Sequence, residues 1–370
     1  SALGGADVSG LSNIAIGSLA MDALTTGVCN IALGTNALGA STTGCFNIAL
    51  GNLALGAGVV TGKQNIALGE STMDALTSGY QNIAMGVNAL GASTTGCINI
   101  AIGTQAMGAT DTTGINNIAI GADAMDALTS GICNVAIGTN ALGASTTGCN
   151  NIAMGELAMG GAVTTAVSSI AIGKSAADAL TSGSCNIAIG ENAYGTAAAG
   201  SDNIAIGRAM TGSLVTGIDN IAIGRSGLNG VLAGKCNIGL GSNALAGLTS
   251  GCLNIAIGRT ALGGATVTSI DNIAIGTSTM DALTSGICNV AIGIDALGAS
   301  TTGCKNIAIG VGALQGGDTT GNSNVAIGEN SLDALTTGIC NVAIGTNALG
   351  AGTTACLNIA IGNLALGTGT

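Results

Sequence analysis

Twelve cysteines stand at two fixed places in a repeated pattern and are the most reactive side chains of this 370-residue chain. One set directly precedes an Asn that opens a recurring motif, and the other set lies two residues before such an Asn. Five pairs have a spacing of 16 residues, one less than a repeat of 17, which would bring stacked neighbours within disulfide reach. We therefore predict the disulfides Cys29–Cys45, Cys133–Cys149, Cys236–Cys252, Cys288–Cys304 and Cys340–Cys356.

The two remaining cysteines, Cys97 and Cys185, have Gln81 and Ser201 where a partner would stand, so we expect them to be unpaired or to bond between chains. Disulfides persist in oxidising compartments, which predicts an extracellular or cell-surface location. The alternative is a column of small, buried free thiols. Metal ligation is poorly supported because the chain has no His and no Cys-x-x-Cys, and we expect neither a metal nor another cofactor.

Other classes of chemistry have little support in the composition. With no His, two Tyr and few carboxylates, no catalytic triad is visible, and we predict that the protein is not an enzyme. The net charge of −11 does not favour nucleic acid, whose phosphates require clustered Lys and Arg. Gly, Asn and Thr interrupt every apolar run before it reaches the length of a membrane span.

The cysteines are positioned by the motif Asn-Ile-Ala-Ile-Gly, which recurs every 17 or 18 residues from Asn13 to Asn358, with Ser169 as the only replacement of the Asn. A repeat this short has no core of its own, so the repeats must stack and bury one another. We predict an all-β parallel β-solenoid of about 21 rungs, 17–18 residues each, as a single continuous domain over residues 1–370.

Within a rung, Ile31 and Leu33 alternate with Ala32 as in a strand, and Gly34 permits a turn. A second short segment follows at 37–38, so we expect two or three short strands per rung. We favour a register with Ile and Leu inward and Ala outward. The reverse register would bury Asn and Ala and display Ile, which would make sense only inside an oligomer. The stacked Asn side chains should form an amide ladder, beginning with Asn13, Asn30, Asn47, Asn65, Asn82 and Asn99.

A longer period of 52 residues groups the rungs in threes. One rung of each triplet carries an Asp that we interpret as a turn residue bonding nearby backbone, with a periodic contact to a neighbouring chain as the alternative: Asp22, Asp74, Asp126, Asp178, Asp281 and Asp333, with Asn229 in the missing place. The position after the invariant Gly is variable and is expected to be a solubilising face. It carries Glu70, Glu156, Lys174, Glu191, Arg208, Arg225, Arg259 and Glu329.

The motif Asn-[Ile/Val]-Ala-[Ile/Leu/Met]-Gly-x-x-Ala, as at 13–20 and 203–210, resembles the head repeats of trimeric autotransporter adhesins of the YadA-like type. It is also similar to solenoid segments of phage tail fibres. The resemblance covers nearly the whole chain, and it implies a parallel β-roll, trimeric in the adhesins, that serves surface attachment.

These observations predict a non-catalytic, extracellular structural protein, a disulfide-stapled solenoid that assembles into a filament or a surface adhesin. The expected partners are copies of itself and a host or environmental surface. The segments 2–4 and 365–367 occupy the same phase of a rung, which suits head-to-tail stacking.

The alternative function is ice binding through a column of threonines, which is interrupted by Val60, Ala198, Val215, Leu232 and Val267. Its members are Thr25, Thr42, Thr77, Thr94, Thr112, Thr129, Thr146, Thr164, Thr181, Thr249, Thr284, Thr301, Thr319, Thr336 and Thr353.

Overall fold

The computed structural model describes residues 9–196, 199–210, 216–228, 233–264, 268–317 and 319–367. The predicted roles of 2–4, Ala198, Val215, Asn229, Leu232 and Val267 fall outside these residues. Internal contacts divide the chain into two compact units, Ser1–Cys185 and Asn186–Thr370. The single continuous domain stays a prediction, and each unit is described by itself.

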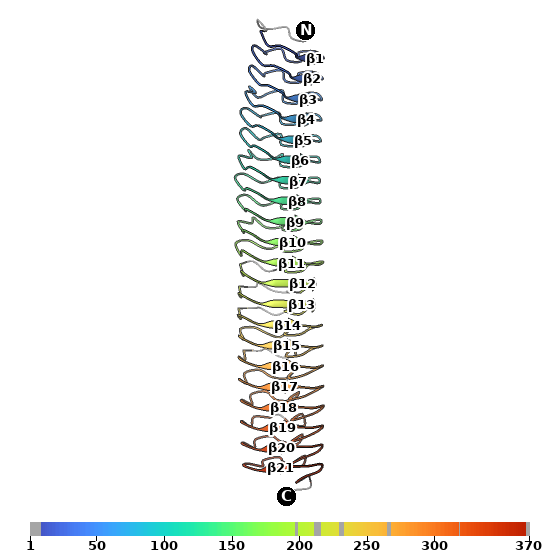
Figure 1. Cartoon of the computed structure of the whole chain (residues 1–370), viewed down its shortest axis with the longest axis vertical. Helices are drawn as coiled ribbons and strands as arrows, with labels where there is room; N and C mark the ends of the chain where they lie inside the picture. The colour runs from blue at the N-terminus through green and yellow to red at the C-terminus, as the bar shows by residue number, and fades with distance from the viewer. Residues whose placement is uncertain are drawn as a thin grey trace. The chain divides into compact units, whose positions relative to one another are not determined.

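Both units are built from short strands that pair in parallel with the next strand along the chain (Figure 1). The strands of the first unit are β1 (Ile14–Ile16), β2 (Ile31–Leu33), β3 (Ile48–Leu50), β4 (Ile66–Leu68), β5 (Ile83–Met85), β6 (Ile100–Ile102), β7 (Ile118–Ile120), β8 (Val135–Ile137), β9 (Ile152–Met154) and β10 (Ile170–Ile172). Those of the second are β11 (Ile187–Ile189), β12 (Ile204–Arg208), β13 (Ile221–Arg225), β14 (Ile238–Leu240), β15 (Ile255–Ile257), β16 (Ile273–Ile275), β17 (Val290–Ile292), β18 (Ile307–Ile309), β19 (Val325–Ile327), β20 (Val342–Ile344) and β21 (Ile359–Ile361). The predicted all-β parallel solenoid is confirmed.

Each rung has one strand in the described residues, so the expectation of two or three strands per rung is wrong. The segment after Gly34 turns instead of extending, because Asn36 and Leu38 take left-handed backbone conformations with φ of 55° and 53°. Such conformations are costly for residues with a Cβ. Hydrogen bonds between rungs offset the cost, since the Asn36 and Leu38 amides donate to Ser18 and Ala54 carbonyls at 2.9 and 3.0 Å.

The preferred strand register is also wrong: Ala points inward and Ile points outward. In β2, Ala32 is fully buried, whereas Ile31 and Leu33 are 38% and 43% exposed. The interior is filled instead from the opposite side of the rung by residues such as Leu38, which is fully buried. The Asn decides the register, because its side chain must lie inside to bond, and strand alternation then turns Ile outward and Ala inward.

The buried Asn side chains bond from rung to rung. The Asn47 Nδ2 donates to Asn30 Oδ1 at 3.3 Å and to the Gly62 carbonyl at 3.0 Å, and the Asn47 backbone N–H donates to the same Asn30 oxygen at 2.9 Å. Because the second acceptor is a backbone carbonyl, the residue that supplies it can vary. Ala166 accepts from Asn151 Nδ2 at 2.8 Å where most rungs have Gly.

The Gly that closes the motif is invariant for two physical reasons. Gly34 has a φ of +138°, a conformation that side chains rarely adopt, and a Cβ there would collide with the backbone of Gly51 in the next rung. Every such Gly from Gly17 to Gly362 has a φ between 126° and 141°.

Candidate interaction surface

The outward side of the strands is a continuous apolar face. Both outward positions of every strand are Ile, Val, Leu or Met, and neither is charged in any rung. Exposures near 38%, as for Ile172 and Ile292, are what remains after neighbouring rungs cover the flanks of each side chain. We call these two columns the isoleucine face.

In the second unit, the isoleucine face measures about 10 Å across a three-residue strand and about 50 Å along eleven strands spaced by about 4.8 Å. Its area is therefore about 500 Å², similar to the largest apolar patch of a typical monomer. With the flanking columns, from the residue before the Asn to the residue after the Gly, the width is about 23 Å and the area about 1,100 Å². A stable protein–protein interface needs about 800 Å² from each partner.

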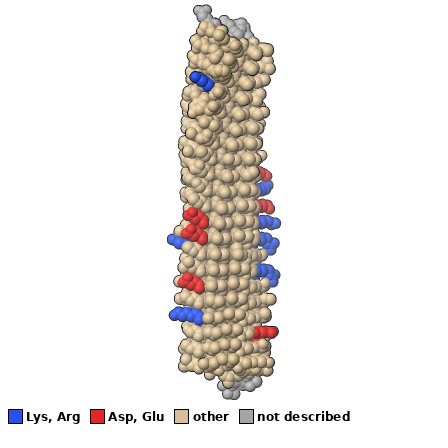
Figure 2. All heavy atoms as spheres, viewed as in Figure 1, with Lys and Arg blue, Asp and Glu red and all other residues tan. Residues whose placement is uncertain are grey.

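Charged side chains gather along the two edges of this surface, with an uncharged surface between them (Figure 2). The basic edge lies at the carboxyl ends of the strands of the second unit and carries Arg208, Arg225 and Arg259. The acidic edge lies at the amino ends of the strands. It carries Asp202, Asp219 and Asp271, all exposed, together with Lys235 and Lys305.

Two arginines of the basic edge are stacked directly on one another. β12 and β13 are each five residues long and pair Arg208 with Arg225 in register. Strand alternation places both on the same side as Ile206 and Ile223, and both are exposed. The ion pair between Lys174 and Glu156, at 3.2 Å, is the only one within 4.0 Å among the described residues, so neither arginine has such a partner. Like charges directly opposite on neighbouring strands are destabilising.

The acidic edge repeats this arrangement in the same two rungs. The register of β12 and β13 aligns Asp202 with Asp219, and the Asp219 amide donates to the Ser201 carbonyl at 3.3 Å. Sequence reasoning treated the arginines as a solubilising face and missed the aspartates. The spacing of 17 residues between Asp202 and Asp219, each directly before a motif Asn, was the available signal.

The predicted disulfides are not formed in the structure, in which all twelve cysteines are free thiols. The register that pairs Ile31 with Ile48 sets Phe46 and not Cys45 beside Cys29, which itself lies in a left-handed turn with φ of 58°. The Cys45 thiol donates instead to the Thr43 carbonyl at 3.3 Å. This correction also applies to Cys133–Cys149, Cys236–Cys252, Cys288–Cys304 and Cys340–Cys356. Cys97 is buried and Cys185 is exposed, so the alternative of a wholly buried thiol column does not hold either.

The aspartate row has a structural role connected to rung length. Asp126 Oδ1 accepts from the Ala109 amide at 2.9 Å, and Asp74 Oδ1 accepts from the Ala57 amide at 3.0 Å. Ala109 and Ala57 lie in rungs of 18 residues, whose additional residue distorts the turn and leaves an amide for the next rung to satisfy. The row is interrupted at Asn229, where the preceding rung has 17 residues.

Four of these aspartates have altered acidity. Burial raises the pKa of Asp126, Asp178, Asp281 and Asp333 above the ordinary value of 3.8. At Asp126, the bond from Ala109 lowers the pKa and the nearby Asp123 carboxylate raises it, but both effects are smaller than burial. The folded protein therefore takes up protons at these carboxyls more readily than the unfolded chain does.

The predicted threonine column is mostly turned toward the backbone. Thr25 and Thr129 are half-buried, and their hydroxyls donate to the Thr42 and Thr146 carbonyls at 3.0 and 2.9 Å. Thr112 is buried and its hydroxyl donates to Leu128 at 2.9 Å. The exposed column is the next residue in each rung, and it includes Thr26, Thr43, Ser78, Thr95, Ser130, Thr147, Ser250, Ser285, Thr302, Thr337 and Thr354.

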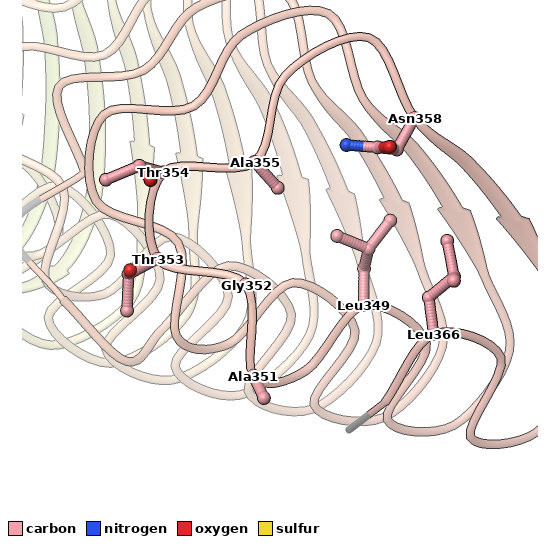
Figure 3. A pocket seen from close by; sticks show the side chains of 8 residues that line it. All are labelled: Leu349, Ala351, Gly352, Thr353, Thr354, Ala355, Asn358 and Leu366. Carbon is pink, nitrogen blue, oxygen red and sulfur yellow. The ribbon is translucent and has the colours of Figure 1, made fainter. Parts of the chain in front are cut away.

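A cavity of about 240 Å³ opens beside β21. Figure 3 shows Leu349, Leu366 and the amide of Asn358 directed into the same space, with Thr353 and Thr354 on the loop opposite. Its lining contains no carboxylate, amine or thiol. Across the described part of the chain, no three His, Cys, Asp or Glu side chains are grouped closely enough to hold a metal ion.

The described residues include no helix of the length and hydropathy needed to cross a membrane. No protein-family model matches the sequence, and no curated protein matches it either. The resemblance to adhesin heads and tail fibres therefore depends on the repeated motif and on the parallel solenoid that the motif builds.

Proposed function

We propose that this chain is a non-catalytic structural protein that associates with copies of itself through the isoleucine face. The observation that carries the proposal is the outward register of Ile. A sheet that displays two unbroken apolar columns leaves an area in water that soluble monomers rarely expose.

The energy available from this face is large. If association removes about 500 Å² of apolar surface from each copy, the hydrophobic gain is about 25 kcal/mol at 25 cal/mol per Å². The loss of translational and rotational freedom costs about 4–15 kcal/mol, with further costs for ordering side chains. The gain exceeds this range, and little side-chain entropy is lost because stacked, β-branched Ile side chains are already restricted.

An extracellular or cell-surface site remains part of the proposal, with a filament or an adhesin as the assembled form. The free thiols remove the disulfides from its support, so the location depends on the motif resemblance.

The test introduces charge on the face and, as a control, on another face of the same rungs. Ile257→Lys with Ile292→Lys places two ammonium groups on the isoleucine face, at side chains that are 36% and 38% exposed. Ser250→Lys with Ser285→Lys places the same charge on the exposed hydroxyl column. Light scattering after size exclusion should give a multiple of 34.7 kDa for the wild type and the control, and 34.7 kDa for the isoleucine variant. Equal masses for the two variants would count against the face.

Ice binding is the second candidate, and the exposed Thr and Ser column now favours it more than the column predicted from the sequence. Hydroxyls repeated at about 4.8 Å can hold water in a regular row. Thermal hysteresis of the wild type, lost on Thr302→Lys, would support this function, and no hysteresis at millimolar protein would remove it.

A further inference from the structure

We propose that two copies pack their isoleucine faces together with their strands stacked in the same direction, so that each acidic edge meets the basic edge of the other copy. This inference rests on the proposed function and adds the partner's orientation and the ion pairs that fix it. It concerns the second unit alone, Asn186–Thr370.

Symmetry separates the two ways in which identical faces can meet. If both copies stack their strands in the same direction, the two-fold axis runs along the stacking direction, and the amino ends of one copy's strands face the carboxyl ends of the other's. If the copies run in opposite directions, each edge meets its own equivalent. The edges of the second unit carry opposite charges, so the choice has an electrostatic consequence.

In the same-direction arrangement, the stacked like charges are neutralised rung by rung. Asp202 lies in the rung of Arg208, and Asp219 lies in the rung of Arg225. Each aspartate pair of one copy therefore faces the arginine pair of the other, and the two-fold axis makes four such contacts. Both repulsive stacks that a single chain contains are relieved together.

The remaining charges of the edges fit the same arrangement. Arg259 and Asp271 stand at opposite edges one rung apart, and so do Lys305 and Glu329. Each would lie diagonally across the interface from an opposite charge. Lys235 faces the neutral Ser242, and Glu191 faces no charge of this unit.

The opposite-direction arrangement pairs fewer charges. Its best register sets Arg208 against Glu329 and Asp219 against Lys305. That register leaves Arg225 facing the apolar Val311 and gives Asp202 no cation. Position 225 therefore distinguishes the two arrangements.

The experiment reverses one charge at a time in the full chain and then mixes the variants. In the same-direction arrangement, Arg225→Asp sets a new carboxylate against Asp219 of the second copy, and Asp219→Arg sets a new guanidinium against Arg225. We expect each variant alone to self-associate at least tenfold more weakly than the wild type. An equimolar mixture should recover association to within about threefold, because every reversed residue then meets its opposite in the other variant.

Sedimentation velocity with one variant fluorescently labelled measures the mixed species, and circular dichroism checks that each variant is folded. Recovery in the mixture requires contact between chains, so a variant that merely misfolds fails to produce it. An associating wild type whose variants are not rescued by mixing would overturn the orientation and leave the proposed function intact. A wild type that sediments as a single chain throughout would overturn both.

Discussion

The Asn ladder is the most demanding structural element of the rung, and Asn134→Ala tests what it contributes to stability. The Asn134 side chain makes four buried hydrogen bonds. Its Nδ2 donates to Asn117 Oδ1 at 3.1 Å and to the Gly148 carbonyl at 2.7 Å. Its Oδ1 accepts from the Asn151 backbone N–H at 3.0 Å and from Asn151 Nδ2 at 3.2 Å.

The expected loss follows from these bonds. A buried hydrogen bond contributes a net of about 1 kcal/mol, so four bonds predict that Asn134→Ala lowers the free energy of unfolding by about 4 kcal/mol. Ser replaces the Asn naturally at Ser169, where its N–H still accepts the support of Asn151 Oδ1 at 2.9 Å. Asn134→Ser should therefore cost about half as much, since one hydroxyl replaces part of the amide's bonding. The exposed Thr139→Ala is the matched control in the same rung and should change stability by less than about 0.5 kcal/mol.

Hydrogen exchange is the appropriate assay, because stacked repeats can open locally before the whole unit unfolds. The Asn151 amide, which loses its acceptor in Asn134→Ala, should exchange at least 100-fold faster, with Asn134→Ser between this variant and the wild type. Urea unfolding gives the accompanying free energy. Unchanged exchange at Asn151, together with a loss below 1 kcal/mol, would refute the reasoning that the ladder holds the rungs together.

Three further outcomes follow from other features of the rung. Because Asp126, Asp178, Asp281 and Asp333 have raised pKa values in the folded state, their contribution to stability is present below pH 3.8 and is lost as the pH rises through the raised values; the urea midpoint at pH 4 relative to pH 7 should therefore be higher for the wild type than for the variant with Asn at all four positions, and an identical ratio would contradict this. Gly138→Ala should cost several kcal/mol, because its φ is +131° and a Cβ would lie 2.7 Å from the Gly155 carbonyl carbon, whereas Gly143→Ala, without a positive φ, should cost far less; equal urea midpoints would count against the steric account. Unfolded protein prepared without reductant should yield twelve reactive thiols in a colorimetric assay, since every cysteine is free, and ten fewer would restore the disulfides.

The fold could be predicted from the sequence because its strongest signal is a repeat. The unbroken period, the Gly at the turn and the Asn before each strand together specify parallel rungs in register. The Gly also carries its own explanation, since a φ near +130° and the close backbone of the next rung exclude other residues.

The direction in which the strand faces could not be predicted from hydrophobicity. Burial of Ile normally outweighs burial of Ala. Here the four hydrogen bonds of each Asn require it to lie inside, and a strand of three residues then has no freedom to turn Ile inward. The interior accepts Ala because Leu38 and its equivalents reach across from the opposite side of the rung.

The edge charges were visible in the sequence but had no geometric meaning until the register was known. With Ile inward, Arg208 and Arg225 would border a polar face, and their stacking would be an isolated defect. With Ile outward, the same residues border an apolar surface that has an acidic edge on its other side. The cysteines failed for a related reason, since a spacing of 16 predicts proximity but not the direction of each thiol.

Sedimentation equilibrium of the wild-type chain tests the central claim, that the isoleucine face is buried against another copy, most directly. Across about 0.1–50 µM protein at physiological salt, the account predicts a weight-average mass that rises with concentration to at least twice 34.7 kDa. A mass that stays at 34.7 kDa over the whole range would contradict it.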